Sequence, residues 1–594
     1  MSRIALLCLF VPLKVFSQEN VTLEKVRVIS DKEISNYNFS HPHVIEEKEL
    51  SSDGATLITE KLKNIEGVYQ SQNGGPGSQT SFFVRGMESR HLLITLDGIK
   101  INDSTAPGRE AQGAYLPSVA LRTLSFYKSP QSVLFGSDSI GGLLALETRK
   151  GNQTPETKIQ IHGGSYGTIA GTLTQDWQAK NHQGTLSLHR FHTDGISRAN
   201  SRRYGADEKD STDITQFATS SKHQWSNSFN TDFLFTYIKN ESELDEFGGD
   251  SKEAEDRNDQ YITGHRTSYS INKNQFITLR NSLNRLQRNV KTTFGDDSYD
   301  GNTYQNELNL TSKFDFAQFV IGAANEKQSY NEESLIKEAF ELNGLFAQTA
   351  FDFNIVKLQF GGRIEKHSEY GSFKTFASGV EGRINSEQRI FTQYSHGYKA
   401  PSLYQLYDPT YGNENLKPEM SHAWELGWEL KKQSMNLGVT LFQNRLKNVF
   451  GSDSNTWRYI QEEGFISEGV ELLAQFNIQD FQWRNSWTHQ EFRKNATDVL
   501  KRPKDMASSS LVYFLDDVSE VALKWRWSSK RKDYGAVGIE ELGEFQVFDL
   551  GYKTEIKKFE VALTVQNLLG REYEEAYGYS VMPLSVFSTV GYKF

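Results

Sequence analysis

The sequence SVFSTVGYKF, residues Ser585–Phe594, ends the chain and decides the fold. Side chains alternate across an extended strand with a period of two, so this stretch has one apolar and one polar face. The apolar face holds Val586, Val590, Tyr592 and Phe594, and the other holds Thr589, Gly591 and Lys593. A transmembrane β-barrel closes with such a strand, because its last strand pairs with its first and presents apolar side chains to lipid. The stretch therefore predicts a protein of the outer membrane.

Alternating segments joined by turns fill the chain from residue 155 onward. Three hairpins have strands at 345–353 and 358–364, at 511–515 and 521–527, and at 548–552 and 559–565. Long polar connections are expected at 198–213, 240–259 and 530–544. Short turns at one end and long loops at the other are typical of an outer-membrane barrel. We therefore expect residues 152–594 to form a transmembrane antiparallel β-barrel of about 22 strands, at about 20 residues for each strand and its connection.

The composition agrees with a barrel and argues against other classes. Mean hydropathy is −0.58, and no apolar run reaches the roughly 18–20 residues that a spanning helix needs. Half of each barrel strand faces a polar lumen, so low hydropathy is expected of this fold. The formal net charge of −10 argues against a nucleic-acid partner.

Residues 1–17 have the pattern of a secretory signal peptide. A charged start at Arg3 is followed by the apolar run Ile4–Leu13 and by small residues up to Ser17. The alternative, a buried N-terminal helix, is interrupted by Pro12 and Lys14. Cleavage after Ser17 would remove the only cysteine of the chain, so we expect a mature protein that is stabilised by hydrogen bonding and packing, without disulfides.

Residues 36–151 lack the long alternating segments of the rest of the chain. A helix is expected at 55–64, a glycine-rich loop at 73–78, and short buried strands at 81–85 and 92–96. These elements predict a compact mixed α/β domain. A barrel of this width leaves a large hole unless something fills it, so we place this N-terminal domain inside the lumen as a plug.

Several motifs recur in an order and spacing that identify a family. They are FVRG (83–86), LITLDGI (93–99), SPQSVLFG (129–136), SIGG (139–142), YKAP (398–401), GNENL (412–416) and NLLGREY (567–573). With them, the sequence resembles the TonB-dependent outer-membrane receptors over its whole length. Within that family it is most similar to the receptors for vitamin B12, through QNGG (72–75), GSDSI (136–140), the segment 398–418 and EEAYGY (574–579).

The resemblance implies an energising partner, TonB, in the periplasm. The segment Leu23–Ser30 resembles a Ton box within a tether at 18–35, and its expected TonB-binding residues are Val26, Arg27, Val28, Ile29 and Ser30. A short extended segment rich in β-branched residues can add to the sheet edge of a partner through main-chain hydrogen bonds. The alternatives are a first strand of the plug or a disordered tail.

Four charges are expected to dock the plug in the barrel. Arg85 and Lys128 occupy plug positions that are cationic in the family, and Glu425 and Glu471 occupy barrel positions where acidic partners are expected. An unpaired charge inside a filled lumen costs several kcal/mol, which favours cross-pairing. The alternative is that the four charges are solvated by water that lines the lumen of the barrel.

The resemblance also implies a ligand that meets the outward loops of the plug and the barrel loop 402–411. The expected ligand-binding residues are Gln72, Asn73, Gly74, Gly75, Ser78, Asn102, Asp103, Arg109, Gln112, Tyr115, Tyr404, Tyr407 and Tyr411. The expected cargo is a scarce, bulky metal chelate, with a corrinoid favoured and a ferric siderophore as the alternative. No histidine lies between residues 401 and 417, where haem receptors of the family place one. A passive porin would lack a plug and a Ton box, and an outer-membrane enzyme would need a catalytic constellation that no spacing suggests.

Acidic clusters in two long loops are candidate calcium ligands, because Ca²⁺ is bound by carboxylate oxygens. One cluster comprises Asp207, Glu208, Asp210 and Asp213, and the other comprises Asp245, Glu246 and Asp250. The candidate ligands among them are Asp207, Asp210, Asp213 and Asp245, and the alternative is ordinary solvated loop charge. No cofactor is otherwise expected. The expected surroundings are lipid and lipopolysaccharide of the outer membrane, and the expected state is a monomer.

Overall fold

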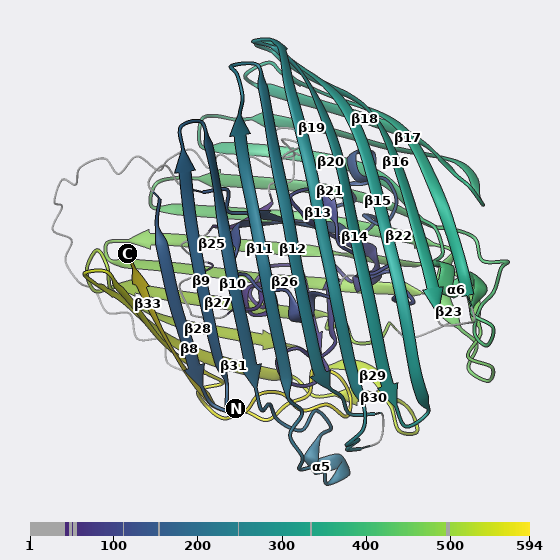
Figure 1. Ribbon diagram of the computed structural model, residues 1–594, viewed down its shortest axis with the longest axis vertical. Helices are drawn as coiled ribbons and strands as arrows, with labels where there is room; N and C mark the ends of the chain where they lie inside the picture. Colours follow the sequence, from purple (N-terminus) through teal and green to yellow (C-terminus); the bar gives the residue numbers. More distant parts are fainter. Residues whose placement is uncertain are drawn as a thin grey trace, which may run out of the picture.

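The computed structural model describes residues 42–46, 50, 56–110, 112–151, 155–246, 249–332, 336–494 and 499–594. The expected signal peptide at 1–17 and the Ton box and tether at 18–35 lie outside the described residues. Two structural units are seen, a closed barrel and a smaller domain inside it (Figure 1).

The barrel has 22 strands, and every neighbouring pair is antiparallel, which confirms the fold predicted from the alternating pattern. The strands are β8 (Thr157–Gly164), β9 (Ile169–Ala179), β10 (His182–Thr193), β11 (Thr212–Gln224), β12 (Phe229–Glu243), β13 (Glu255–Asn272), β14 (Gln275–Thr292), β15 (Gly295–Lys313), β16 (Ala317–Glu332), β17 (Ile336–Asp352), β18 (Val356–His367), β19 (Gly371–Arg383), β20 (Gln388–Lys399), β21 (Glu419–Lys431), β22 (Met435–Lys447), β25 (Phe465–Ile478), β26 (Phe481–Lys494), β27 (Asp505–Phe514), β28 (Glu520–Ser528), β31 (Phe545–Ile556), β32 (Phe559–Gln566) and β33 (Ser585–Lys593).

The C-terminal strand β33 closes the barrel. It pairs with β32 on one side and with β8 on the other, where Phe587 lies opposite Gly164 and Lys593 opposite Lys158. Val590 points outward and is 46% exposed, whereas its neighbour Thr589 is buried against the interior. The apolar face read from the sequence is therefore the outer face of the wall.

The long connections all lie at one end of the barrel, whereas the other end has short turns alone among the described residues. Turns such as 180–181, 273–274 and 557–558 join strands at one end, and segments such as 400–418 and 567–584 join them at the other. The expected loop 240–259 is shorter than predicted, because β12 continues to Glu243 and β13 begins at Glu255. The loop expected at 198–213 is the connection between Thr193 at the end of β10 and Thr212 at the start of β11. The expected loop 530–544 contains a hairpin of β29 (Arg531–Gly535) and β30 (Gly538–Leu542).

The interior domain is built on a five-stranded sheet in the order β1-β6-β7-β4-β5. Its strands are β1 (His43–Glu46), β6 (Leu121–Tyr127), β7 (Gly142–Thr148), β4 (Leu92–Leu96) and β5 (Ile99–Lys100), beside the hairpin of β2 (Val68–Gln72) and β3 (Thr80–Val84). The expected helix 55–64 is the shorter α3 (Ile58–Leu62), since Leu57 forms a β-bridge to Pro117 and a turn begins at Lys63. Strand β3 ends before Arg85 because Arg85 and Gly86 both adopt positive φ. A second helix, α4 (Ser132–Phe135), follows β6.

The interior domain packs directly on the barrel wall. Its sheet residues Phe126 and Leu144 share one buried apolar cluster with Ile214, Leu234 and Ile262 of strands β11 to β13. In Figure 1 the domain, drawn in purple, lies within the ring of barrel strands. The lumen of the barrel is therefore filled by the N-terminal part of the chain, and the domain is a plug.

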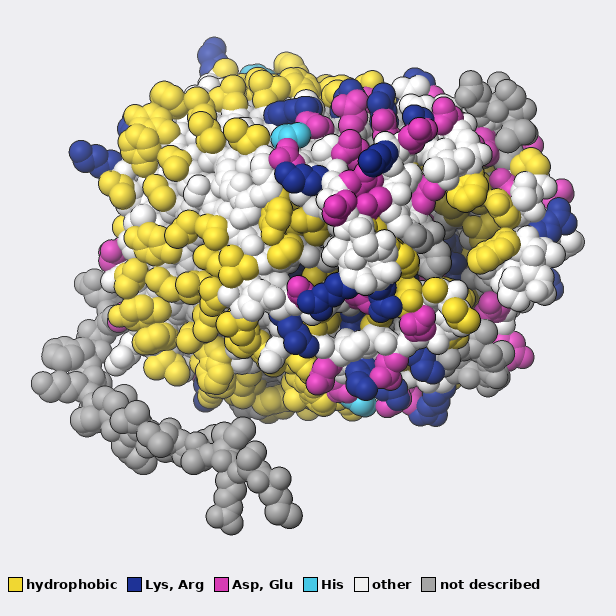
Figure 2. Space-filling model, turned by 90° about the horizontal axis from the view of Figure 1, so that it is seen from below, with side chains coloured by type: hydrophobic (Ala, Val, Ile, Leu, Met, Phe, Trp, Pro, Cys, Tyr) yellow, Lys and Arg dark blue, Asp and Glu magenta, His cyan; other side chains and the backbone are white. Residues whose placement is uncertain are grey.

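The outer surface is divided by side-chain type. Large apolar residues such as Ile161, Ile321 and Leu345 are more than half exposed on the wall, where a membrane protein presents them to lipid. Figure 2 shows hydrophobic side chains gathered over one part of the surface, with charged side chains concentrated in another. Among the described residues, no helix has the length and apolar character needed to cross a membrane.

Candidate functional site

The four expected docking charges come together at the interface of plug and barrel. Arg85 Nη1 lies 2.8 Å from Glu425 Oε1, and Arg85 Nε lies 2.9 Å from Glu471 Oε1. Lys128 Nζ lies 2.8 Å from Glu471 Oε2. All four side chains are buried. Burial lowers the pKa of Arg85, but Glu425 and Glu471 outweigh it and hold that pKa above its usual value, so Arg85 stays charged.

A glycine makes room for this quartet. Gly67 has φ +72°, and a Cβ there would lie 1.9 Å from Glu471 Oε1. Any larger residue would push Glu471 away from Arg85 and Lys128. The preceding residue, Glu66, gives Lys128 a second carboxylate at 3.3 Å. Burial raises the pKa of Glu66, but Lys128 and His43 bring it well below its usual range.

A cavity of about 340 Å³ lies between the plug loops and the loop ends of the barrel strands. Its lining combines plug residues with residues of β13, β14, β15 and the helix α6 (Leu403–Tyr407). Three expected ligand-binding residues, Gln112, Tyr115 and Tyr404, line it. Three barrel residues that the sequence did not single out, Asp256, Arg288 and Tyr299, complete its wall.

Other expected ligand residues in the glycine-rich loop shape that loop. Gln72 Nε2 and Ser78 Oγ both donate to the carbonyl oxygen of Gly75, at 2.9 and 2.7 Å. Asn73 Nδ2 donates to Gln79 Oε1 at 3.4 Å. Gly74 has φ +118°, and a Cβ there would lie 2.6 Å from Cγ of Arg198. The loop is thereby held against its neighbours, with Gln79 facing the cavity.

The second plug loop likewise buries residues that were expected to contact ligand. Asn102 Nδ2 donates to the carbonyl oxygens of Leu92 and Arg109, at 3.2 and 2.9 Å. Asp103 Oδ1 accepts from the backbone N–H of Thr105 at 2.7 Å. Neither Asn102, Asp103 nor Arg109 lines the cavity, because each side chain is used to fold the loop or to bind the barrel.

The two other expected tyrosines belong to the same barrel loop as Tyr404. Tyr407 packs against apolar clusters that include Leu403 and Leu406. Tyr411 is 39% exposed, and its carbonyl oxygen accepts a hydrogen bond from the backbone of Tyr459. Neither tyrosine lines the cavity.

A buried triad ties the second plug loop to the barrel. Arg109 Nη2 donates to Asp138 Oδ1 at 2.7 Å and to the carbonyl oxygen of Ala400 at 2.8 Å. Lys399 Nζ donates to the same Asp138 oxygen at 2.9 Å. Ser402 Oγ donates to the carbonyl oxygen of Pro107 at 2.7 Å. Asp138 and Lys399 were missed as partners, although each lies in a motif that carries the family resemblance.

The charges around the cavity are mixed in sign. Arg288 Nε donates to Asp256 Oδ1 at 3.1 Å, and Glu110 also lines the cavity. Nearby Asp103 is buried, and this burial raises the pKa of its carboxyl. With two lining carboxylates and one lining guanidinium, the cavity is not a basic pocket.

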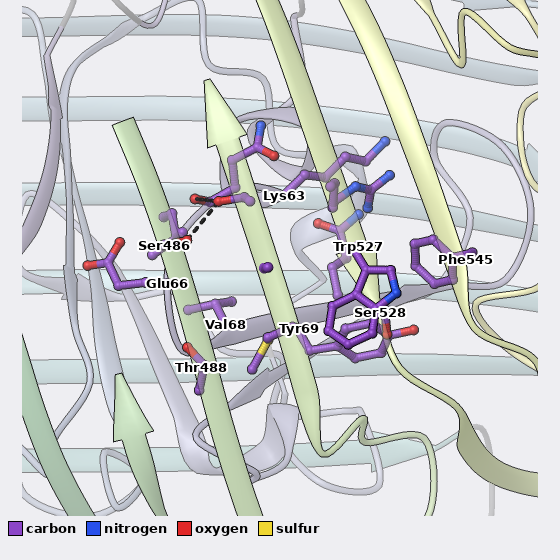
Figure 3. Close-up of a pocket in the computed structure, with 16 residues that line it drawn as sticks. Lys63, Glu66, Val68, Tyr69, Ser486, Thr488, Trp527, Ser528 and Phe545 are labelled. Carbon is purple, nitrogen blue, oxygen red and sulfur yellow. Dashed lines mark hydrogen bonds between the residues drawn. The ribbon is translucent and has the colours of Figure 1, made fainter. Parts of the chain in front are cut away.

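A second, smaller cavity of about 30 Å³ separates the plug from the wall. Figure 3 shows Val68 of the plug beside Thr488 of the barrel, with Phe545 of the barrel on the other side of Tyr69. This space is about the size of a water molecule. The interface here combines apolar packing of Tyr69 on Phe545 with a small cavity that polar groups such as Thr488 also line.

Three residues of the two expected acidic loop clusters come together in the structure. Carboxylate oxygens of Glu208, Asp245 and Asp250 lie within 4.8 Å of one another. Asp210 is close enough to Asp245 to interact with it, and burial first, then Asp245, raise its pKa to about 7. Asp207 contributes only its backbone N–H, which donates to Asp250.

Asp213 lies apart from this acidic cluster. It pairs with Arg190 and, at 3.2 Å, with His192 Nδ1. Of the four expected candidates, Asp245 therefore belongs to the cluster, Asp210 borders it, and Asp207 and Asp213 bring no side chain to it.

The barrel has 22 strands, its own N-terminal domain fills the lumen, and a cavity lies between the plug loops and the barrel. This architecture defines the class of a plugged transporter of the outer membrane. A family model described as TonB dependent receptor-like, beta-barrel, matches residues 155–568, and the model of the TonB-dependent Receptor Plug Domain matches residues 40–143. The chain belongs to the TonB-dependent receptors, which are transporters of the outer membrane and not enzymes. Membership implies a TonB partner and a transported ligand.

Among curated relatives, the Vitamin B12 transporter BtuB of Photobacterium profundum is 24% identical over 585 residues, covering 93% of this chain and 92% of the relative. Two solved structures share the fold. The siderophore receptor PirA from Acinetobacter baumannii has a TM-score of 0.80 at 14% identity, covering 95% of this chain and 99% of that chain. The FrpB iron transporter from Neisseria meningitidis has a TM-score of 0.82 at 13% identity, covering 94% and 100%.

Proposed function

We propose that this transporter takes up a corrinoid, with a ferric siderophore as the second candidate. The observation that carries the proposal is the match to a vitamin B12 transporter over 93% of the chain. The structural likeness to siderophore and iron transporters is at 13–14% identity and supports the shared fold.

The chemistry of the cavity favours the corrinoid. A ferric catecholate is strongly anionic and would be matched by a basic pocket, whereas this lining has Glu110 and Asp256 against Arg288. A corrinoid carries peripheral amides, which Gln79, Gln112 and the tyrosine hydroxyls can bind. Tyrosines supply large amphipathic contact area at low entropic cost.

Binding titrations decide between the two cargoes. Cyanocobalamin and a panel of ferric siderophores, including a catecholate, are titrated into the purified full-length protein. We expect saturable binding of cyanocobalamin, weakened at least tenfold by Gln112→Ala together with Tyr404→Ala. Binding of a siderophore alone, with none of cyanocobalamin, would transfer the assignment to the second candidate.

Energy for uptake is proposed to arrive through the Ton box at Val26–Ser30. Its sequence suits addition to a sheet edge of TonB, and the outer membrane offers no ATP. Deletion of Val26–Ser30 should leave ligand affinity unchanged and abolish uptake into cells. A deletion of equal length elsewhere in the tether, at 31–35, is the matched control. Uptake that persists without Val26–Ser30 would remove this role.

We also propose that Glu208, Asp245 and Asp250, with Asp210 beside them, hold a calcium ion that orders the loops. The residues fit, since three carboxylates from two loops converge within 4.8 Å, compatible with Ca²⁺–oxygen distances of about 2.3–2.6 Å. Glu208 Oε1 is buried without a hydrogen-bond partner among the described residues. A bound cation would offset the effects of burial and of Asp245, which raise the pKa of Asp210.

Calcium binding is measured by isothermal titration with CaCl₂ on the full-length protein. Asp245→Asn should weaken binding at least tenfold, whereas Asp213→Asn, which pairs with Arg190, should not. Equal binding by wild type and Asp245→Asn would reject the site.

A further inference from the structure

Outward-facing cations near the loop ends of several barrel strands are paired with carboxylates. The pairs are Lys239–Glu241 at 2.9 Å, Arg257–Glu255 at 2.6 Å and Arg285–Asp300 at 2.6 Å. Arg493 also pairs with Glu468. Pairing leaves these parts of the wall close to neutral.

The wall formed by β19 to β22 is different. Lys374, Arg445 and Lys447 are exposed there, and none of the three has an ion-pair partner among the residues that the structure describes. His396 lies opposite His422 in the strand register, and His422 lies opposite Arg445. The two imidazole rings are 4.8 Å apart. These five residues, which we call the basic patch, form one group of cationic and titratable side chains.

Aromatic side chains lie next to the basic patch on the membrane side. Trp424 is 54% exposed and packs 4.6 Å from Tyr394, and Phe376 is 50% exposed. The hydroxyl of Tyr394 is 2.7 Å from His422 Nδ1. Aromatic girdles mark the boundary between apolar and polar regions of an outer-membrane barrel. The basic patch, one step closer to the long loops, is therefore at the level of lipid headgroups in the outer leaflet.

We propose that the basic patch binds the phosphorylated headgroup of a lipid in the outer leaflet. Guanidinium and ammonium groups bind phosphate through short charge-assisted hydrogen bonds, and a headgroup phosphate would supply the anion that the protein does not. His396 adds a further polar group, because it is 8% exposed and its Nδ1 has no partner among the described residues. The cations on β12 to β14 already have carboxylate partners, so they do not need an external anion.

The test uses the full-length protein in nanodiscs of zwitterionic lipid, with diphosphoryl lipid A as the probe. Bound lipid is counted by native mass spectrometry as the lipid is titrated. Arg445→Gln with Lys447→Gln should weaken binding at least tenfold. The matched control, Lys239→Gln with Arg257→Gln, removes the same charge from paired positions and should change binding less than twofold. Correct folding of both variants is checked by the heat-dependent shift of the barrel in gel electrophoresis.

Two further probes distinguish the source of the phosphate. A dephosphorylated form of the same lipid should bind at least tenfold more weakly, and inorganic phosphate at millimolar concentration should not displace the lipid. Equal binding of the dephosphorylated lipid would overturn the proposal, as would displacement by inorganic phosphate. Equal losses in the two double variants would also overturn it, because the effect would then reflect overall charge.

Discussion

Single residues decide how firmly the second plug loop is held against the barrel. One carboxylate, Asp138, serves two buried cations, Arg109 and Lys399. Burial raises the pKa of Asp138, but the two cations bring it well below its usual value. Because loop 402–411 begins directly after Lys399–Ala400, a ligand that moves this loop would act on the triad.

The triad predicts that a second substitution partly restores the stability that a first one removes. Asp138→Asn leaves two buried cations without a carboxylate, and breaking such a pair costs about 3–5 kcal/mol. Hydrogen exchange of segment 131–142 should therefore accelerate. Adding Lys399→Met should recover part of the protection, since Arg109 keeps the carbonyl oxygen of Ala400. A double variant as loose as Asp138→Asn alone would contradict this account.

The docking quartet gives a second prediction. Glu471→Met removes the carboxylate shared by Arg85 and Lys128, and its cost should again be about 3–5 kcal/mol. Arg85→Met is the second single variant. In the double variant the costs should fall short of their sum by about 0.5–3 kcal/mol, as expected for residues in contact. Denaturant unfolding followed by a fluorophore on a cysteine introduced into the plug measures the three values, and strict additivity would show that the pair is not coupled.

Asp210 gives a pH dependence. Its pKa is raised from 3.8 to about 7, so between these values the folded loop holds a proton that the unfolded chain has released. Folded-loop stability is therefore greatest below pH 3.8 and falls as the pH rises toward 7. Hydrogen-exchange protection of residues 198–211, corrected for intrinsic rates, should decline over this range.

Two controls accompany the pH experiment. Asp210→Asn should abolish the decline, because the amide does not titrate. Added calcium should also abolish it, by favouring the ionised carboxylates. A decline that persists in Asp210→Asn would assign the effect to another group.

At the scale of one element, strand β33 tests the membrane placement of the wall. Val590 faces outward, and an arginine on the lipid face of a barrel costs about 2–4 kcal/mol near the bilayer midplane. Val590→Arg should show this loss in guanidinium titrations of the barrel in lipid vesicles. Val590→Leu is the control and should be close to wild type. An equal stability of Val590→Arg would mean that this face does not contact hydrocarbon.

The elements were predictable wherever alternation is strong. Barrel, plug and closing strand follow from the two-residue period and the motif order. The ends of β12 and β13 were not, because their pairing continues past the apolar band with polar residues such as Lys239 and Glu241. No apolar pattern marks where such a strand stops, since the outward residues such as Glu241 and the inward residues such as Asn240 and Asn258 are all polar there.

The site was predictable in its docking charges and in part of its cavity. Gln112, Tyr115 and Tyr404 line the cavity, whereas Arg109 and Asn102 are used within the plug and its barrel contact. A sequence places a polar residue in a loop but does not show which way it turns. The partnership of Asp138 with Lys399 spans 261 residues, and such a contact follows only from the closed topology.

At the scale of the whole molecule, the plug decides whether the barrel conducts. The intact protein should show almost no ion conductance in planar bilayers, because the plug fills the lumen. Deletion of residues 36–151 should open a large, ungated conductance, since the barrel strands close on one another without the plug. A high conductance of the intact protein would instead indicate a passive porin.

The unequal strand lengths have a consequence for how cargo arrives. Strands β13, β14 and β15 have 18, 18 and 19 residues, whereas β28 has 9. At about 3.4 Å per residue the first three are roughly 60 Å long and β28 is roughly 30 Å. The barrel wall is therefore taller along β13 to β15 than along β28, and the rim of the barrel is oblique. A ligand that approaches along the cell surface therefore meets this taller wall on one side and, on the other, the β29–β30 hairpin that follows the short strand β28.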